Sequence, residues 1–340
     1  MILEDTKRSN YGCVQLGPRV KCLRPLYEAI EERAAQLAQQ YENRDNNGPP
    51  AIVQIPTGVQ ALDDYGLLTP GILTLFVMHP GDGKTSVVLQ LLKGAVSCGY
   101  TPRAWLFEDP LPLVADRYLS QELNESAYLL RTLKLGENMP SRLSAATREL
   151  DWTKQVLVED LKEDSERFFE QLETAGDDAG LGVVDYAQAF DAEPDGANQE
   201  RVIARAAWGI SNWSKRTGNA SVLMSQPKPA VADRGRKHYD SWLWDKKRKG
   251  EEIKPDPEAV EGYRPGDGDA GGCTAAYQRA KDFISGFRPG RWLNNHGLTC
   301  QDNVMEFLRT KGNYTPGNYP VRCRWNGSTT TISDMPKKNK

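Results

Sequence analysis

Ile72-Leu-Thr-Leu-Phe-Val-Met78-His-Pro-Gly-Asp-Gly-Lys84-Thr-Ser86 is the stretch that decides the fold of this 340-residue chain. Its apolar run over 72–78 predicts a buried strand, and Lys84–Cys98 predicts a helix. Between them, small residues let backbone N–H groups turn inward around a phosphate, and the helix N-terminus adds partial positive charge. The stretch therefore predicts a phosphate-binding loop. The residues expected to contact a nucleotide are Pro80, Gly81, Asp82, Gly83, Lys84, Thr85 and Ser86.

Two side chains of this loop carry specific expectations. Lys84 is expected to reach the β- and γ-phosphates of ATP, and the Thr85 hydroxyl to hold Mg²⁺. One departure from the usual pattern is Met78, which stands where a glycine precedes the lysine by six residues. Because this position ends the strand, a side chain is tolerable there. ATP and Mg²⁺ are thus the predicted ligands.

Strands alternate with helices in the rest of the chain. Strands are expected at 104–107, 155–158, 181–184, 221–225, 283–287 and 304–309, and helices at 111–123, 142–150, 161–174 and 198–216. This alternation predicts an α/β fold with a mostly parallel sheet flanked by helices. A C-terminal β-hairpin is expected over 321–332, with a tight turn at Asn326-Gly327. Residues 227–272 are rich in Gly, Pro and charge, and indicate a long loop or insertion.

Polar residues end three of the expected strands, at the edge where parallel sheets bind ligands. Asp185 follows an apolar strand and is a candidate Mg²⁺-associated carboxylate, although a strand-end Asp is common. Glu108 is a candidate for the base that polarises the attacking water, with Asp109 as its competitor. Gln226 is a candidate sensor of the γ-phosphate, or a plain polar cap of its strand.

The N-terminal segment differs from the rest. Residues 1–50 are expected to form an arm and a linker helix, and 51–340 the main domain. Residues 26–42 place Leu26, Ile30 and Leu37 on one helical face, followed by a Pro- and Gly-containing linker at 43–50. This amphipathic helix either packs on its own core or docks onto a neighbouring subunit.

Composition excludes several classes of protein. No apolar run reaches the ~18 residues of a membrane span, and no secretory signal is visible at the N-terminus, which favours a cytoplasmic protein without a membrane partner. The six cysteines form no CxxC pair and there are only three histidines, so neither a zinc site nor a disulfide framework is expected. With a net charge of −3, nucleic acid would be bound by a local patch or by a ring of subunits.

Such a patch is visible within the expected loop. Residues 233–254 hold eight Lys/Arg against five Asp/Glu, interleaved with Tyr and Trp. Cations neutralise phosphates, and aromatic faces stack on bases without reading sequence. The candidate DNA-binding residues are Arg234, Arg236 and Lys237. The alternative is a solvated insertion that its tryptophans anchor to the body.

The order of these pieces resembles the RecA-like motor of the DnaB-type hexameric replicative helicases. The matching segments are Ile55-Pro-Thr-Gly-Val-Gln-Ala-Leu-Asp63, the phosphate loop, Leu106-Phe-Glu-Asp109, Val184-Asp-Tyr-Ala-Gln188 and Met224-Ser-Gln-Pro227. They cover roughly residues 51–335. About 50 residues precede this motor, too few for the globular N-terminal domain of the family. A short form of this kind would suit a phage or plasmid replicon in a bacterial host.

The resemblance implies a ring of subunits, a hexamer in this family, that hydrolyses ATP between subunits and translocates on single-stranded DNA. It makes Glu108 the base, Asp185 the Mg²⁺-associated residue and Gln226 the sensor. It aligns Arg309-Thr-Lys311 with a Lys-x-Arg pair that reaches a neighbour's γ-phosphate, with the two cations exchanged. Arg and Lys differ in geometry, so the exchange is not neutral, and two exposed cations also suit a solvated edge. Primase, a loader or a single-strand binding protein are possible partners.

Other functions share this core. A RecA-, KaiC- or RadA-like DNA-dependent ATPase would hydrolyse ATP without unwinding. A protein that uses ATP as an assembly switch would form rings but turn over slowly. A helicase loader is a third alternative, although the Asp185-Tyr-x-Gln188 pattern speaks against it.

Overall fold

The computed structural model describes residues 12–16, 19–23, 54–132, 134, 138–149, 157–160, 165–176, 179–190, 199–271, 274–312 and 319–336. The chain divides into two compact units, Met1–Val53 and Gln54–Lys340. The described part of the first unit is an antiparallel hairpin of β1 (Gly12–Leu16) and β2 (Arg19–Leu23), which the sequence analysis did not predict. The expected helix at 26–42 lies outside the described residues.

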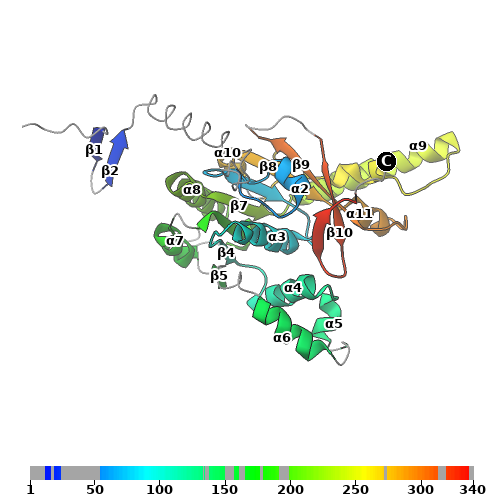
Figure 1. Cartoon of the computed structure of the whole chain (residues 1–340). Coiled ribbons are helices and arrows are strands. Elements are labelled where there is room, and N and C mark those ends of the chain that lie inside the picture. The colour runs from blue at the N-terminus through cyan, green and yellow to red at the C-terminus, as the bar shows by residue number, and fades with distance from the viewer. Residues whose placement is uncertain are drawn as a thin grey trace, which may run out of the picture. The chain divides into compact units, whose positions relative to one another are not determined.

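A nine-stranded sheet organises the described part of the second unit (Figure 1). Its order is β11-β10-β9-β8-β3-β7-β6-β4-β5, so the strand that leads into the phosphate loop, β3, lies at the centre. Strands β3 to β8 run parallel to their neighbours, and β9, β10 and β11 continue antiparallel from β8. The strands are β3 (Leu73–Val77), β4 (Arg103–Leu106), β5 (Leu157–Asp160), β6 (Leu181–Asp185), β7 (Ala220–Ser225), β8 (Asp282–Phe287), β9 (Val304–Lys311), β10 (Val321–Asn326) and β11 (Thr331–Asp334).

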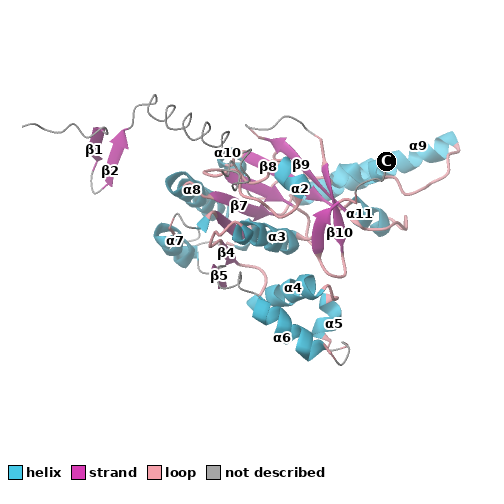
Figure 2. Cartoon of the chain, viewed as in Figure 1, coloured by secondary structure: helices cyan, strands magenta, loops and turns pink. Residues whose placement is uncertain are grey.

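Helices cover both faces of this sheet, which confirms the predicted fold class (Figure 2). They are α2 (Gln60–Asp64), α3 (Lys84–Ser97), α4 (Leu111–Leu123), α5 (Ala127–Arg131), α6 (Met139–Glu149), α7 (Ser165–Thr174), α8 (Gln199–Thr217), α9 (Pro229–Lys249), α10 (Thr274–Arg279) and α11 (Pro289–Asn295), with short 3₁₀ helices η3 (Ala187–Ala189) and η4 (Pro257–Tyr263). In the part of the chain that the structure describes, no helix is long and apolar enough to cross a membrane.

The largest core lies between the sheet and α7, α8 and α10. Trp105 of β4 meets Phe168 of α7 and Trp213 of α8 edge-on, with ring centroids 5.4 and 6.1 Å apart. All three rings are buried, and fully buried aromatic side chains are among the largest contributors to a core. This layer fixes the parallel strands from behind. Helix α3 packs against β6 and β11 and carries the phosphate loop at its N-terminus.

The prediction of a long loop at 227–272 is wrong, because most of its first half is the 21-residue helix α9. Pro229 occupies the first helical turn, where the missing N–H costs nothing, and Gly250 ends the helix with φ of +67°. Gly235 lies inside the helix because a Cβ there would overlap the Tyr263 ring of η4. The residues that suggested a loop therefore start, pack and end a helix.

The C-terminal hairpin is present, but the predicted tight turn is wrong. Asn326 pairs with Thr331, so the connection holds four residues, and the positive φ falls on Thr330, at +55°. The Asn326 side chain accepts hydrogen bonds from the backbone N–H and the hydroxyl of Ser328, at 3.2 and 2.8 Å. This local turn explains why Asn-Gly does not itself form the two-residue bend.

Candidate nucleotide-binding site

The phosphate loop adopts a conformation that its glycines permit. Gly81 and Gly83 have φ of +76° and +100°, a region that side-chain-bearing residues rarely adopt. Neighbours also crowd both positions, since a Cβ on Gly81 would lie 2.9 Å from Arg291 and one on Gly83 3.1 Å from Trp325. Helix α3 begins directly after Gly83, so its free N–H groups point out of the carboxyl end of the sheet. The loop therefore has the backbone of an anion cradle.

Lys84 lies between an acid and an aromatic ring. Its Nζ is 3.2 Å from Glu108 Oε2, just beyond the end of β4, and 3.8 Å from the centroid of the Tyr186 ring. The lysine side chain is only 6% exposed, whereas Glu108 is 43% exposed. The structure thus brings together the two residues that sequence reasoning placed at the ends of separate strands. It adds Tyr186, which sequence reasoning quoted only as part of a motif.

The Thr85 hydroxyl lies between two carboxylates. Its Oγ1 is 3.2 Å from Asp109 Oδ2 and 3.3 Å from Asp185 Oδ2. Asp185 is buried, and its Oδ1 has no hydrogen-bond partner among the described residues. Burial raises the pKa of Asp185 to about 6, opposed by Lys84 and reinforced by Glu108 and Asp109. A buried carboxylate oxygen without a partner beside a hydroxyl suits a bound divalent cation.

Gln226 is connected to the same site through Tyr186. Its side chain forms a hydrogen bond with Tyr186 that lowers the pKa of that phenol, while burial raises it more strongly. The Gln226 backbone N–H donates to Gln188 Oε1 at 3.1 Å, and Gln188 Nε2 donates to the Ser225 hydroxyl at 2.8 Å. The ends of β6 and β7 are thereby joined beside Lys84.

The outer side of the phosphate loop is held by two arginines that sequence reasoning missed. Arg288 donates to the Gly81 carbonyl oxygen at 2.9 Å, and Arg291 of α11 forms an ion pair with Asp82. The Asp82 side chain is fully buried, so only its backbone faces a nucleotide, unlike its loop neighbours. Burial raises the pKa of Asp82 to about 6, although Arg291 lowers it. The signal for this clamp was the repeated arginine in Arg288-Pro-Gly-Arg291, at the start of α11.

Arg309 and Lys311 are not the pair of exposed cations that the sequence suggested. Arg309 is 4% exposed, and its guanidinium donates to the carbonyl oxygens of Tyr65 and Gly66 at 2.9 and 2.6 Å. It also lies 3.6 Å from the buried carboxylate of Asp282. The expectation that Arg309 reaches a neighbour's nucleotide is therefore wrong, because its charge is bound within its own subunit. Lys311 is half-buried and donates to the carbonyl of Tyr277 at 2.6 Å.

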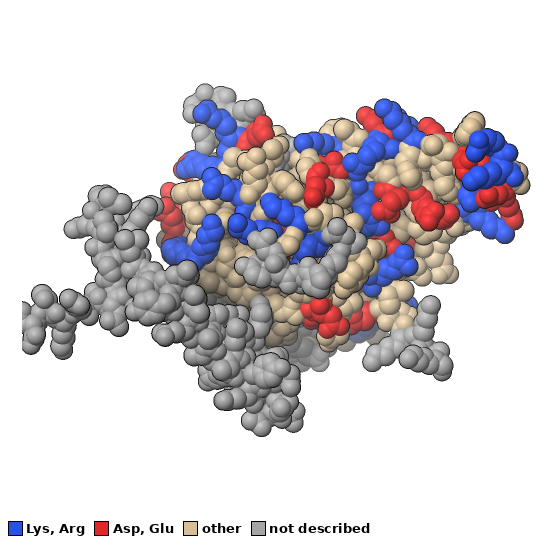
Figure 3. Space-filling model, turned by 90° about the horizontal axis from the view of Figure 1, so that it is seen from above, with Lys and Arg blue, Asp and Glu red and all other residues tan. Residues whose placement is uncertain are grey.

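The three candidate DNA-binding residues of α9 differ in their surroundings. Arg234 donates to the carbonyl oxygens of Gly262 and Arg264 and pairs with Asp269 at 2.8 Å, so it fastens α9 to the body. Arg236 and Lys237 are exposed. Figure 3 shows basic and acidic side chains mixed along the arm that α9 forms at the right of the molecule. At its tip, Lys246, Arg248 and Lys249 pair with acids, and Trp244 is 62% exposed.

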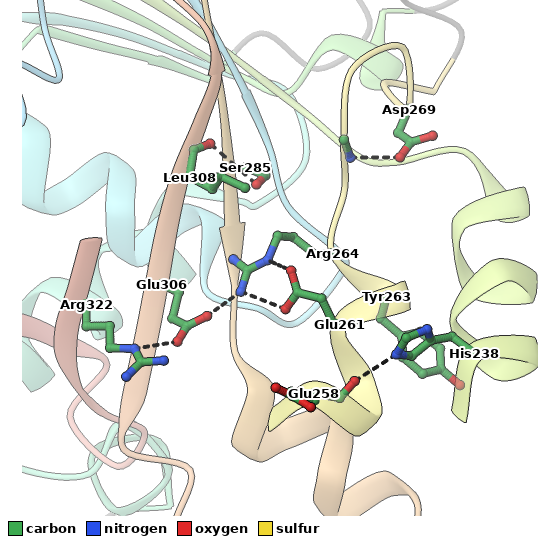
Figure 4. Close-up of polar contacts among 12 residues, drawn as sticks. His238, Glu258, Glu261, Tyr263, Arg264, Asp269, Ser285, Glu306, Leu308 and Arg322 are labelled. Atoms are coloured by element: carbon green, nitrogen blue, oxygen red, sulfur yellow. Dashed lines mark hydrogen bonds and ion pairs between the residues drawn. The ribbon is translucent and has the colours of Figure 1, made fainter. Parts of the chain in front are cut away.

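The base of α9 is joined to the sheet by a polar cluster (Figure 4). Arg264, which follows η4, pairs with Glu261 at 2.6 Å and with the buried Glu306 of β9. Glu306 in turn accepts from Arg322 of β10 at 2.8 Å. The His238 ring of α9 lies within 2.8 Å of the Glu258 carbonyl oxygen. The arm is therefore rooted in charged contacts rather than loosely attached.

Known structures share this architecture. The ATPase domain of a phage helicase superposes with a TM-score of 0.68 at 15% identity, covering 90% of this chain and 99% of that one. A DnaB-like replicative helicase, described with its interactions with primase, gives 0.67 at 16% identity, covering 92% of this chain and 72% of that one. The RadB recombinase gives 0.50 at 15% identity, covering 83% and 100%. No model of a known protein family matches the chain, and no curated protein does.

These likenesses show the fold. The chain has the RecA-like α/β architecture of DnaB-like helicase ATPase domains, as the sequence analysis predicted. Identities of 15–16% carry no activity with them, so the roles of individual residues rest on the geometry above.

Proposed function

We propose that this chain is an ATP-dependent DNA helicase that translocates on single-stranded DNA as a ring, a hexamer by analogy with the family it resembles. The observation that carries the proposal is the meeting of Lys84, Thr85, Glu108 and Asp185 at the carboxyl ends of β3, β4 and β6. These are the side chains that phosphoryl transfer to water requires: a phosphate-binding cation, a metal-facing hydroxyl and two carboxylates.

The residues of the site fit a nucleotide and Mg²⁺. Thr85 and the unpartnered Oδ1 of Asp185 supply oxygen donors on one side of the loop, where Mg²⁺ would neutralise charge on the β- and γ-phosphates. Lys84 exchanges Glu108 for the phosphates, which leaves the more exposed Glu108 free to orient water. Gln226 and Tyr186 then lie beside the lysine, placed to respond to the γ-phosphate.

DNA binding is assigned to the exposed part of α9. Arg236 and Lys237 are placed to neutralise phosphates, whereas Arg234 is committed to the body of its own subunit. A ring multiplies this small basic surface, which offsets the net charge of −3 per chain. With Arg309 buried, Lys311 is the remaining candidate of the predicted pair for a neighbour's nucleotide.

A second candidate function is a RecA-like ATPase that moves on or coats DNA without unwinding it. The likeness to the RadB recombinase favours it, because that structure shares the fold across its whole length. Glu108 separates both enzymes from a protein that uses ATP only as an assembly switch, since its loss would leave a switch intact.

The test is ATP-dependent unwinding of a forked duplex by the purified chain. Lys84→Ala is the control for nucleotide dependence. The paired variant Arg236→Ala/Lys237→Ala is compared with Lys215→Ala, which removes an exposed charge from α8. Unwinding that both Lys84→Ala and the paired variant abolish, and that Lys215→Ala preserves, supports the helicase. ATPase activity stimulated by single-stranded DNA without unwinding favours the second candidate, and the absence of both contradicts the proposal.

A further inference from the structure

Asp109 is a second carboxylate on the metal side of the nucleotide site. It follows Glu108 beyond β4, and its Oδ2 lies 3.2 Å from the Thr85 hydroxyl, closer than the 3.3 Å of Asp185 Oδ2. β4 and β6 are neighbours, with Leu106 opposite Asp185, so the sheet itself sets the two acids side by side. A threonine hydroxyl has one proton to donate and cannot serve both carboxylates at once. One of the two therefore faces the hydroxyl without receiving its proton.

Arg117 of α4 fixes Asp109 in place. Its Nη1 forms an ion pair with the same Oδ2 atom that faces Thr85, and both side chains are largely buried, at 31% and 21% exposure. A charge-assisted contact of this kind restricts the carboxylate more than a neutral hydrogen bond does. Because Oδ2 is committed to Arg117 and Thr85, Asp109 is poorly placed to orient an attacking water. The alternative left open between Glu108 and Asp109 as base is thereby decided for Glu108.

The charges of the site leave a place for a cation. Three carboxylates, those of Glu108, Asp109 and Asp185, face the side chains of Lys84 and Arg117. The buried Asp185 Oδ1 has no partner among the described residues and belongs to this cluster. An ATP molecule adds further negative charge, which a divalent cation would compensate.

We propose that Asp109 is a positioning residue of the metal shell, one that accepts a hydrogen bond from water on a divalent cation held at Thr85, with Arg117 setting its orientation. This inference rests on the proposed nucleotide site. It adds a metal-side role for Asp109 and Arg117, and it ties α4 to the metal side of that site. Partners of this outer kind typically change metal affinity by about 10- to 100-fold when removed.

The experiment measures Mn²⁺ binding by electron paramagnetic resonance, with the full chain and a non-hydrolysable ATP analogue. Asp109→Asn is expected to weaken Mn²⁺ binding by about tenfold or more. Asp116→Asn is the matched control, since Asp116 lies on α4 one residue from Arg117 but pairs outward with Arg131 at 3.6 Å. It is expected to bind Mn²⁺ as the wild type does. Equal Mn²⁺ affinity of the two variants overturns the inference.

Two further measurements keep the outcomes distinct. Arg117→Gln is expected to weaken Mn²⁺ binding and Arg117→Lys to restore part of it; an Arg117→Gln protein with wild-type affinity contradicts the orienting role and serves if Asp109→Asn does not fold. Binding of a fluorescent ATP analogue without metal, with Lys84→Ala as control, tests the site itself. A wild type that binds no nucleotide refutes the proposed function, whereas nucleotide binding with unchanged Asp109→Asn refutes only the inference.

Discussion

Replacing Arg309 with methionine tests whether this residue stabilises its own subunit. The change keeps most of the side-chain volume but removes the guanidinium that bridges Tyr65, Gly66 and Asp282. Arg309 and Asp282 are 4% and 3% exposed, so the variant leaves a buried carboxylate without that cation. Removing one partner of a buried ion pair costs about 3–5 kcal/mol. At about 2 °C per kcal/mol for a chain of this size, the melting temperature falls by roughly 6–10 °C.

Urea unfolding followed by circular dichroism measures this loss. Lys311→Met is the matched control, because it removes a cation two residues away that donates a hydrogen bond to the Tyr277 carbonyl. That variant is expected to lose about 1 kcal/mol. The double variant Arg309→Met/Asp282→Asn removes both charges and should recover part of the loss of Arg309→Met.

The outcome also decides the role of Arg309. If Arg309→Met is as stable as Lys311→Met, the guanidinium is not a buried brace and the reasoning from its contacts is refuted. If it is equally stable and has also lost ATPase activity, Arg309 acts on the nucleotide after all. A strongly destabilised Arg309→Met protein leaves Lys311 as the residue to test for a role at a neighbour's site.

Three further substitutions test the packing around the site. Because burial raises the pKa of Asp82 to about 6 from an unfolded value of 3.8, its charged form disfavours folding. The stability of the wild type relative to Asp82→Asn should therefore rise by roughly 3 kcal/mol as the pH falls from about 7 to about 4, measured by urea unfolding; a difference that is flat with pH contradicts this. Gly94→Ala should destabilise α3 by about 1–3 kcal/mol, because its Cβ would overlap the backbone at 56–57, whereas helix propensity alone predicts a gain. Gly235→Ala in α9 should likewise lose stability against the Tyr263 ring, and a higher melting temperature would show that η4 does not pack there.

The parts of the site that sequence predicts are those set by local pattern. Residues 72–86 fix a strand, a glycine loop and a helix within one continuous stretch, and the structure has β3 and α3 within a residue or two of the expected bounds. Glu108 and Asp185 follow because parallel strands place their carboxyl ends at one edge. A single residue and the strand that precedes it are enough for such a prediction.

The parts that sequence misses depend on distant packing. Arg309 reads as an exposed cation at a strand end, and only the approach of Tyr65 and Gly66, more than 240 residues earlier, shows that it is buried. Helix α9 reads as a loop because glycine and charge suggest one. The reason for Gly235 is a ring in η4 that no local pattern announces.

The acid within the phosphate loop carries this reasoning one step further. Asp82 is flanked by Gly81 and Gly83, whose positive φ values turn its backbone toward a phosphate and its side chain to the opposite side. A carboxylate turned into the protein requires a cation, and Arg291 supplies it from a helix 209 residues later in the chain. An acid at this position of a glycine loop therefore predicts a buried basic partner on the far side of the loop. The search for that partner in a sequence begins with arginines at the start of a later helix, as in Arg288-Pro-Gly-Arg291.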